Sequence, residues 1–111
     1  MNSTARAGIT YPITTSCGTM LITINTINCK PVEVLINIGK CGGCALAQSE
    51  ASARLISLIL QKSNIEISEV IRQLVSIQCN QPILNGATSC ADAIAKVLSK
   101  YNFDNALTFV D

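Results

Sequence analysis

Six cysteines and the absence of histidine are the features of this 111-residue sequence that bear most directly on chemistry. A cysteine thiolate binds soft metals or takes part in thiol–disulfide exchange. Without histidine, the chain cannot build a Cys–His catalytic pair or a mixed Cys/His metal site from its own residues. The functional question is therefore what the sulfur atoms do.

Several of the cysteines lie where an expected strand or loop gives way to an expected helix. Cys41 and Cys44 occur within Gly39–Cys44, and Cys90 follows Ser89. A thiol at the N-terminus of a helix lies near the positive end of the helix dipole, which favours the thiolate and its chemistry. The alternative is that the cysteines are ordinary core residues, because cysteine is among the residue types most often buried.

The composition predicts a single packed domain, with 49% hydrophobic and 14% charged residues. A net charge of +1 and few aromatic residues argue against nucleic-acid binding. No apolar run approaches the roughly 20 residues of a membrane span, and the first residues lack the apolar stretch of a signal peptide. We therefore expect no membrane association and a cytoplasmic location, where cysteines favour metal or redox function over structural disulfides.

The first half of the sequence predicts strands. Ile9–Ile13 is a short strand that Pro12 would confine to a sheet edge. Residues 19–27 and 31–39 alternate between apolar and other side chains, and a turn at Asn28–Pro31 lies between them. This pattern predicts an antiparallel hairpin with one buried face.

From Cys44 onward the apolar residues recur at helical spacing, which predicts three helices. The expected buried stripes are Cys44, Ala47, Ala51, Leu55 and Leu58 in the first helix, Ile67, Val70, Ile71, Leu74 and Ile77 in the second, and Ile94, Val97, Leu98 and Tyr101 in the third. Ser89 is the expected N-cap of the third helix, with Asp92 three residues later.

The predicted fold class is α+β, a small antiparallel sheet followed by three helices packed on it. The expected organisation is a flexible lead-in over residues 1–8, one domain over 9–101, and a tail over 102–111.

Four cysteines lie at the ends of these expected elements, where several ends can converge on one point. Cys17 precedes the first full strand and Cys79 follows the second helix, while helical spacing places Cys44 and Cys90 on inward faces. Four thiolates suit either a zinc ion or an iron–sulfur cluster. Their spacing is unlike that of common zinc modules, which use two close pairs.

The segment Gly39–Cys44 supports two further interpretations. Cys41 and Cys44 have the spacing of a redox-active pair, although thioredoxin-like folds place such a pair in a parallel βαβ unit. Lys40, Gly42 and Gly43 have the composition of an anion-binding loop, and the alternative is that the glycines only allow a tight turn.

The sequence resembles the TSCPD domain family over roughly residues 15–100. The segments that carry the resemblance are Gly18–Asn25, Pro31–Val34, Gly39–Ala45, Arg54–Leu58, Ile71–Leu74 through Cys79, and Thr88–Ala95. The family occurs as a C-terminal domain of adenosylcobalamin-dependent ribonucleotide reductases and as small stand-alone proteins. The resemblance implies a stand-alone accessory module without catalysis of its own, with ribonucleotide reductase or another enzyme as partner.

The resemblance also bears on individual cysteines. The recurring cysteines of the family fall on Cys17, Cys44, Cys79 and Cys90, the four that lie at element ends. Cys29 and Cys41 are peculiar to this chain, which weakens the redox interpretation. Ala91 stands where the name motif of the family has proline, and both residues suit the first turn of a helix. The sequence leaves the identity of a metal and the oligomeric state open.

Overall fold

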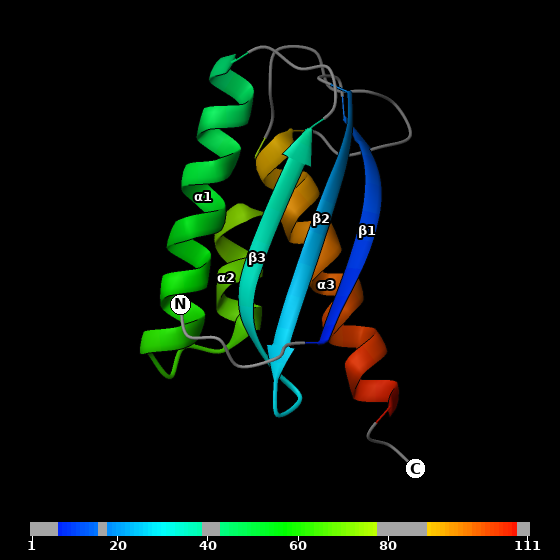
Figure 1. The fold of residues 1–111 in the computed structure, drawn as a ribbon, viewed down its shortest axis with the longest axis vertical. Coiled ribbons are helices and arrows are strands. Elements are labelled where there is room, and N and C mark those ends of the chain that lie inside the picture. The colour runs from blue at the N-terminus through cyan, green and yellow to red at the C-terminus, as the bar shows by residue number, and fades with distance from the viewer. Residues whose placement is uncertain (1–6, 16–17, 39–42, 78–88, 109–111) are drawn as a thin grey trace.

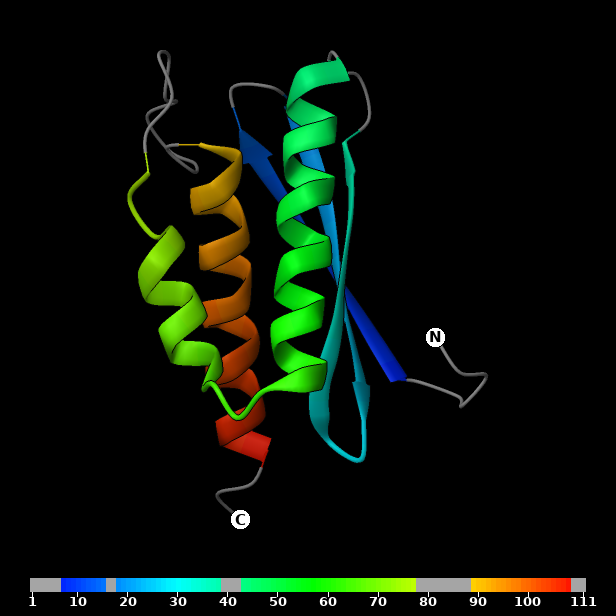
Figure 2. The same ribbon diagram turned by 90° about the vertical axis from the view of Figure 1, so that its left-hand side faces the viewer.

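The computed structural model describes residues 7–15, 18–38, 43–77 and 89–108, which form a three-stranded antiparallel sheet with helices on one face (Figures 1 and 2). The elements in chain order are β1 (Ala7–Thr15), β2 (Gly18–Ile27), β3 (Lys30–Ile38), α1 (Gly43–Lys62), α2 (Ile67–Leu74) and α3 (Cys90–Thr108). The strand order is β1-β2-β3. The predicted α+β class is confirmed.

The core lies between the helices and one face of the sheet. Met20, Ile22 and Ile24 of β2 are completely buried, and Val34 and Ile38 of β3 are nearly so. These are the alternating positions that the sequence assigned to a buried face, because successive side chains of a strand point to opposite sides. The predicted one-sided burial of the hairpin is confirmed.

The hairpin turn between β2 and β3 is shorter than the four residues that the sequence indicated. It consists of Asn28 and Cys29, both with positive φ angles (54° and 65°), as a type I′ hairpin turn requires. Pro31 belongs to β3, beside a shift in pairing register between Asn25 and Thr26. A proline is tolerated there because β3 is an edge strand and the ladder is already irregular.

The strand β1 is longer than the predicted Ile9–Ile13. It begins at Ala7, so Ala7 and Gly8, which the sequence assigned to the lead-in, pair with β2. Because β1 pairs only with β2, Pro12 lies on an edge strand, as predicted.

The helix α1 packs along β3 and covers part of its outer edge. The Ser57 hydroxyl accepts a hydrogen bond from the Val34 N–H (2.9 Å), and the Gln61 side-chain amide donates to the Val32 carbonyl oxygen (2.8 Å). An uncovered edge strand offers such groups to other chains. These two contacts therefore anchor α1 to the sheet and reduce the ability of β3 to pair further.

The predicted buried stripe of α1 is wrong. Leu55 and Leu58 are 61% and 54% exposed, and Ala47 and Ala51 are exposed as well. Over residues 46–62 of α1, where burial is described, the buried residues are Ser49, Ala53, Ile56 and Leu60. The helix carries apolar residues on two opposite faces, and the contacts of Ser57 and Gln61 with β3 select the second.

The helix α2 lies beside α3, with Val70 buried and Ile67, Ile71 and Leu74 packed against the core. The predicted stripe is confirmed except at Ile77, which is exposed. The helix ends before it, because Val75 is extended and Ser76 has a φ angle of 67°.

The helix α3 contains the completely buried Ile94 and Leu98, which confirms its predicted stripe. It continues to Thr108, so residues 102–108 are helical rather than part of a tail. Asparagine is a weak helix former, but helix propensity alone rarely decides a boundary, and the helix continues past Asn102. The Lys100–Asp104 ion pair (3.7 Å) spans this region. None of the helices described is long and apolar enough to cross a membrane.

The two faces of α1 can be distinguished by measurement. Ile56→Ala should lower the free energy of unfolding by about 2–5 kcal/mol, since it leaves a cavity in the core. Leu55→Ala should change it by no more than about 0.5 kcal/mol in dilute solution. Urea unfolding followed by circular dichroism measures both values. The reverse order would mean that the leucine stripe is the core face.

Candidate functional site

The elements run alternately in opposite directions, and this places three connections at one end of the molecule. The described residues that flank these connections are Thr15 and Gly18, Ile38 and Gly43, and Ile77 and Ser89. They lie toward the upper end of the molecule in Figures 1 and 2, whereas the β2–β3 turn and the α1–α2 loop lie at the opposite end. We call the end with the three connections the connection end.

Five of the six cysteines fall within or beside these three connections in the sequence. Cys44 is the second residue of α1 and Cys90 the first of α3. Cys17, Cys41 and Cys79 fall in the three connections, outside the described residues, as does the side chain of Cys44. Only Cys90 among the four predicted metal ligands has a described side chain.

The inward orientation predicted for Cys44 loses its support, because it was inferred from the α1 stripe that proves to be exposed. Lys40 and Gly42 also lie outside the described residues, and Gly43 is the first residue of α1. The anion-binding and redox interpretations of this segment stay predictions.

Cys29 and Cys90, the two cysteines with described side chains, lie at opposite ends of the molecule. Cys29 is exposed and lies in the β2–β3 turn, at the end of the molecule opposite the connection end.

The start of α3 is capped as the sequence predicted. The Ser89 hydroxyl accepts a hydrogen bond from the Asp92 N–H (2.9 Å), and the Ser89 carbonyl accepts one from the Ala93 N–H (2.9 Å). Such a cap satisfies N–H groups that have no partner within the helix. Cys90, the next residue, is half-buried and packs against the core, in line with the inward face expected for it.

Asp92 is the residue of this region that sequence reasoning underestimated. Its side chain is completely buried, Oδ1 accepts a hydrogen bond from the Ser76 N–H (2.7 Å), and Oδ2 lies 2.9 Å from Lys96 Nζ. A buried carboxylate is tolerated only when it is paired and hydrogen-bonded. The i,i+4 spacing of Asp92 and Lys96 was the available sequence signal.

The Asp92 contacts join two parts of the chain that the sequence separates. Ser76 lies just after α2 and Asp92 in the first turn of α3, so the hydrogen bond holds the two flanks of the 78–88 connection together. Both carboxylate oxygens of Asp92 therefore have protein partners. The described residues contain no group of three or more potential metal ligands.

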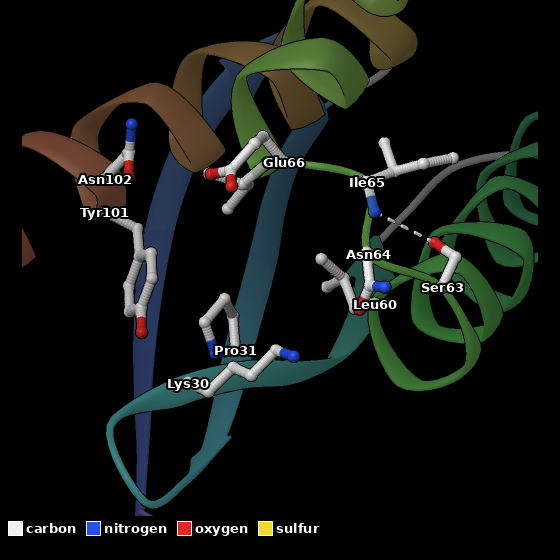
Figure 3. A pocket seen from close by; sticks show the side chains of 10 residues that line it. Lys30, Pro31, Leu60, Ser63, Asn64, Ile65, Glu66, Tyr101 and Asn102 are labelled. Atoms are coloured by element: carbon white, nitrogen blue, oxygen red, sulfur yellow. Dashed lines mark hydrogen bonds between the residues drawn. The ribbon is translucent and has the colours of Figure 1, made fainter.

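A separate pocket of about 340 Å³ lies at the opposite end, between the start of β3, the α1–α2 loop and α3 (Figure 3). Its lining includes Lys30, Glu66 and the ring of Tyr101. The Tyr101 hydroxyl is buried and has no hydrogen-bond partner among the described residues. No residue that the sequence predicted to be functional lines this pocket.

The two tyrosines near this end share an unusual environment. Burial raises the pKa of Tyr101, and the nearby Tyr11 and Cys29 raise it further. Burial likewise raises the pKa of Tyr11, with a contribution from the negative charge of Asp104. Both hydroxyls therefore stay protonated at neutral pH and can act only as neutral hydrogen-bonding groups.

The comparisons with known proteins support the sequence resemblance. The family model described as the TSCPD domain matches residues 2–102 of the 111-residue chain. No curated protein and no solved structure shows a significant match.

The Asp92 contacts make a prediction about stability. Asp92→Asn should lower the free energy of unfolding by about 1.5–3 kcal/mol, because hydrogen bonds to a buried charged group are lost or reversed. The matched control is Glu69→Gln, since Glu69 forms an exposed ion pair with Arg72 (3.5 Å). This control should change stability by no more than about 0.5 kcal/mol. Equal effects of the two substitutions in urea unfolding would contradict the assigned role of Asp92.

The tyrosine environment makes a prediction about alkaline pH. Tyr11 and Tyr101 are the only tyrosines and the chain has no tryptophan, so ultraviolet absorbance reports tyrosine ionisation cleanly. In the folded protein the midpoint of tyrosine ionisation should lie above the ordinary pKa of 10.0. The unfolded chain then loses its tyrosine protons first, so stability is full below about pH 10 and falls as the pH rises further. Folded and urea-unfolded protein titrating together would refute this.

Proposed function

The chain belongs to the TSCPD domain family, and from this premise we propose that it is an accessory module in which four cysteines bind a zinc ion or an iron–sulfur cluster. The four ligands are Cys17, Cys44, Cys79 and Cys90. The module catalyses no reaction by itself and serves ribonucleotide reductase or a related enzyme in the cytoplasm. The partner follows from the family resemblance and the metal from the cysteines.

The observation that carries the proposal is the common location of the three connections. Their flanking residues lie at one end of the molecule, and each connection contains or adjoins at least one of the four cysteines. Ligands that are distant in sequence can meet only where the chain returns to the same place. The alternating direction of six elements returns it to the connection end three times.

The surroundings of Cys90 also suit a bound metal. The Ser89 cap fixes the backbone from which Cys90 extends, and the Asp92–Ser76 hydrogen bond fixes the chain that leads toward Cys79. Metal sites depend on such outer contacts, because they hold the ligands in position before the metal binds. The N-terminus of α3 additionally favours the thiolate form that a metal requires.

A site of four thiolates has a restricted chemistry. Zinc bound by four cysteines has no open coordination position, so it stabilises a fold rather than activating a substrate. An iron–sulfur cluster bound by four cysteines supplies electron transfer instead. Either role suits a module that assists another protein.

The thiol redox alternative has less support. A redox pair at Cys41 and Cys44 would resemble thioredoxin-like proteins, where the preceding strand belongs to a parallel βαβ unit. Here β3, which precedes α1, pairs antiparallel with β2, and the described sheet contains only antiparallel pairs. The strand context of the pair is therefore different.

Metal analysis of protein purified without oxygen tests the proposal. The wild type should contain about one zinc ion or one cluster per chain. Cys44→Ser should lose most of that metal together with thermal stability, because metal binding is coupled to folding. Cys29→Ser is the matched control and should retain both, since Cys29 lies at the opposite end of the molecule.

The outcomes separate the alternatives. Metal-free wild type, or full metal content in Cys44→Ser, refutes the metal site. If the cysteines are core residues, Cys44→Ser lowers the free energy of unfolding by about 1–3 kcal/mol whether or not a chelator is present. A reversible disulfide in place of a metal would instead establish the redox alternative.

A further inference from the structure

The helix α1 presents an apolar stripe on the side that faces away from the sheet. The stripe consists of Ala47, Ala51, Leu55 and Leu58, with the two leucines more than half exposed. In Figure 2 α1 lies in front, and no other described element covers its outer side. We call this set of residues the outer stripe.

The outer stripe is flanked by hollows that extend the apolar surface. A hollow of about 230 Å³ between α1 and α2 is lined by Leu55, Ile59 and Val70 among others. A second, of about 360 Å³ between α1 and β3, is lined by Leu35 and Leu58 among others. Monomeric proteins rarely leave a large continuous apolar surface in water, so such a surface usually marks an interaction site.

The sizes of the side chains along the outer stripe suit a second copy of the same helix. The two small residues, Ala47 and Ala51, lie toward the N-terminal half and the two large ones, Leu55 and Leu58, toward the C-terminal half. When two such helices pack antiparallel, Leu58 lies opposite Ala47 of the second copy and Leu55 opposite Ala51. The two pairings agree to within one residue of register, so large side chains meet small ones along the contact.

The charges beside the outer stripe are complementary close to that register. Glu50 and Arg54 form an exposed ion pair (2.5 Å) along the edge of the stripe that faces β3. In antiparallel packing the two-fold axis is perpendicular to both helices. The Glu50–Arg54 edges of the two copies then lie on the same side of the contact and run in opposite directions. Glu50 of each copy then lies opposite Arg54 of the other. Parallel packing about a two-fold axis would carry the two Glu50–Arg54 edges to opposite sides of the contact, so these charges would not meet.

We propose that the outer stripe of α1 is a self-association surface, through which two copies of this chain pack α1 against α1 in antiparallel orientation about a two-fold axis. The contact is isologous, so one surface serves both copies and the assembly closes as a dimer. A contact centred on one helix pair is small among specific interfaces. The dimer should therefore dissociate on dilution.

Sedimentation equilibrium of reduced protein over a wide concentration range tests the proposal. The wild type should show a monomer–dimer equilibrium. Glu50→Arg alone and Arg54→Glu alone each place like charges opposite each other twice, so each should weaken the homodimer roughly tenfold or more. A mixture of the two variants should form a heterodimer, because its facing charges are opposite again. The double variant Glu50→Arg, Arg54→Glu should restore the homodimer.

The controls test whether the outer stripe itself forms the contact. Glu69→Arg reverses an exposed charge on α2, outside the outer stripe, and should leave the dimer unchanged. Leu55→Glu should abolish the dimer while circular dichroism shows a folded monomer, because Leu55 is exposed in the single chain. Measurement with and without a chelator separates this association from metal binding.

Three results would overturn the proposal. The first is a wild-type protein that remains monomeric at every concentration, even if its outer stripe binds a different protein. The second is a dimer that neither single charge reversal weakens, which would place the interface elsewhere. The third is a mixture of the two variants that associates no better than either variant alone.

Discussion

A three-stranded sheet with one apolar face cannot stand alone in water, and covering that face is the constraint on which this structure depends. Met20, Ile22 and Ile24 of the central strand are completely buried. The helix α3 covers the part of the face over β1 and β2, and α1 covers the part over β3. Burial of such side chains is the main favourable term in folding, at about 1.5–3 kcal/mol for each large one. The positions of α1 and α3 follow from this requirement, and α2 packs in turn against α3.

The way in which α1 meets the sheet has a second consequence. Ser57 and Gln61 satisfy backbone groups of β3, so the helix must turn these polar residues inward together with Ala53, Ile56 and Leu60. Its other apolar residues then face water. The fold of one chain thus leaves an apolar surface uncovered, and the arrangement of size and charge on that surface suits a second copy. Edge protection and self-association are linked through the orientation of one helix.

The connection end depends on the same packing. Because successive elements run in opposite directions, three connections return to one end of the molecule. The buried Asp92 then ties the chain after α2 to the first turn of α3. This tie acts on the backbone beside Cys90 and on the chain that continues toward Cys79. The fold already holds the residues that flank these connections at one end of the molecule. The proposed metal would join the connections themselves.

The sequence by itself determined the elements of this protein that depend on local pattern. Alternation in β2 and β3, helical spacing in α2 and α3, and the Ser89 cap are all short-range signals, and the structure confirms them. The family was likewise recognisable from short motifs. Only the tertiary structure decided which face of α1 is buried, since both faces carry apolar residues and the choice depends on contacts with β3. It also decided the burial of Asp92, because the partner Ser76 lies sixteen residues away and spacing along a helix cannot reveal it.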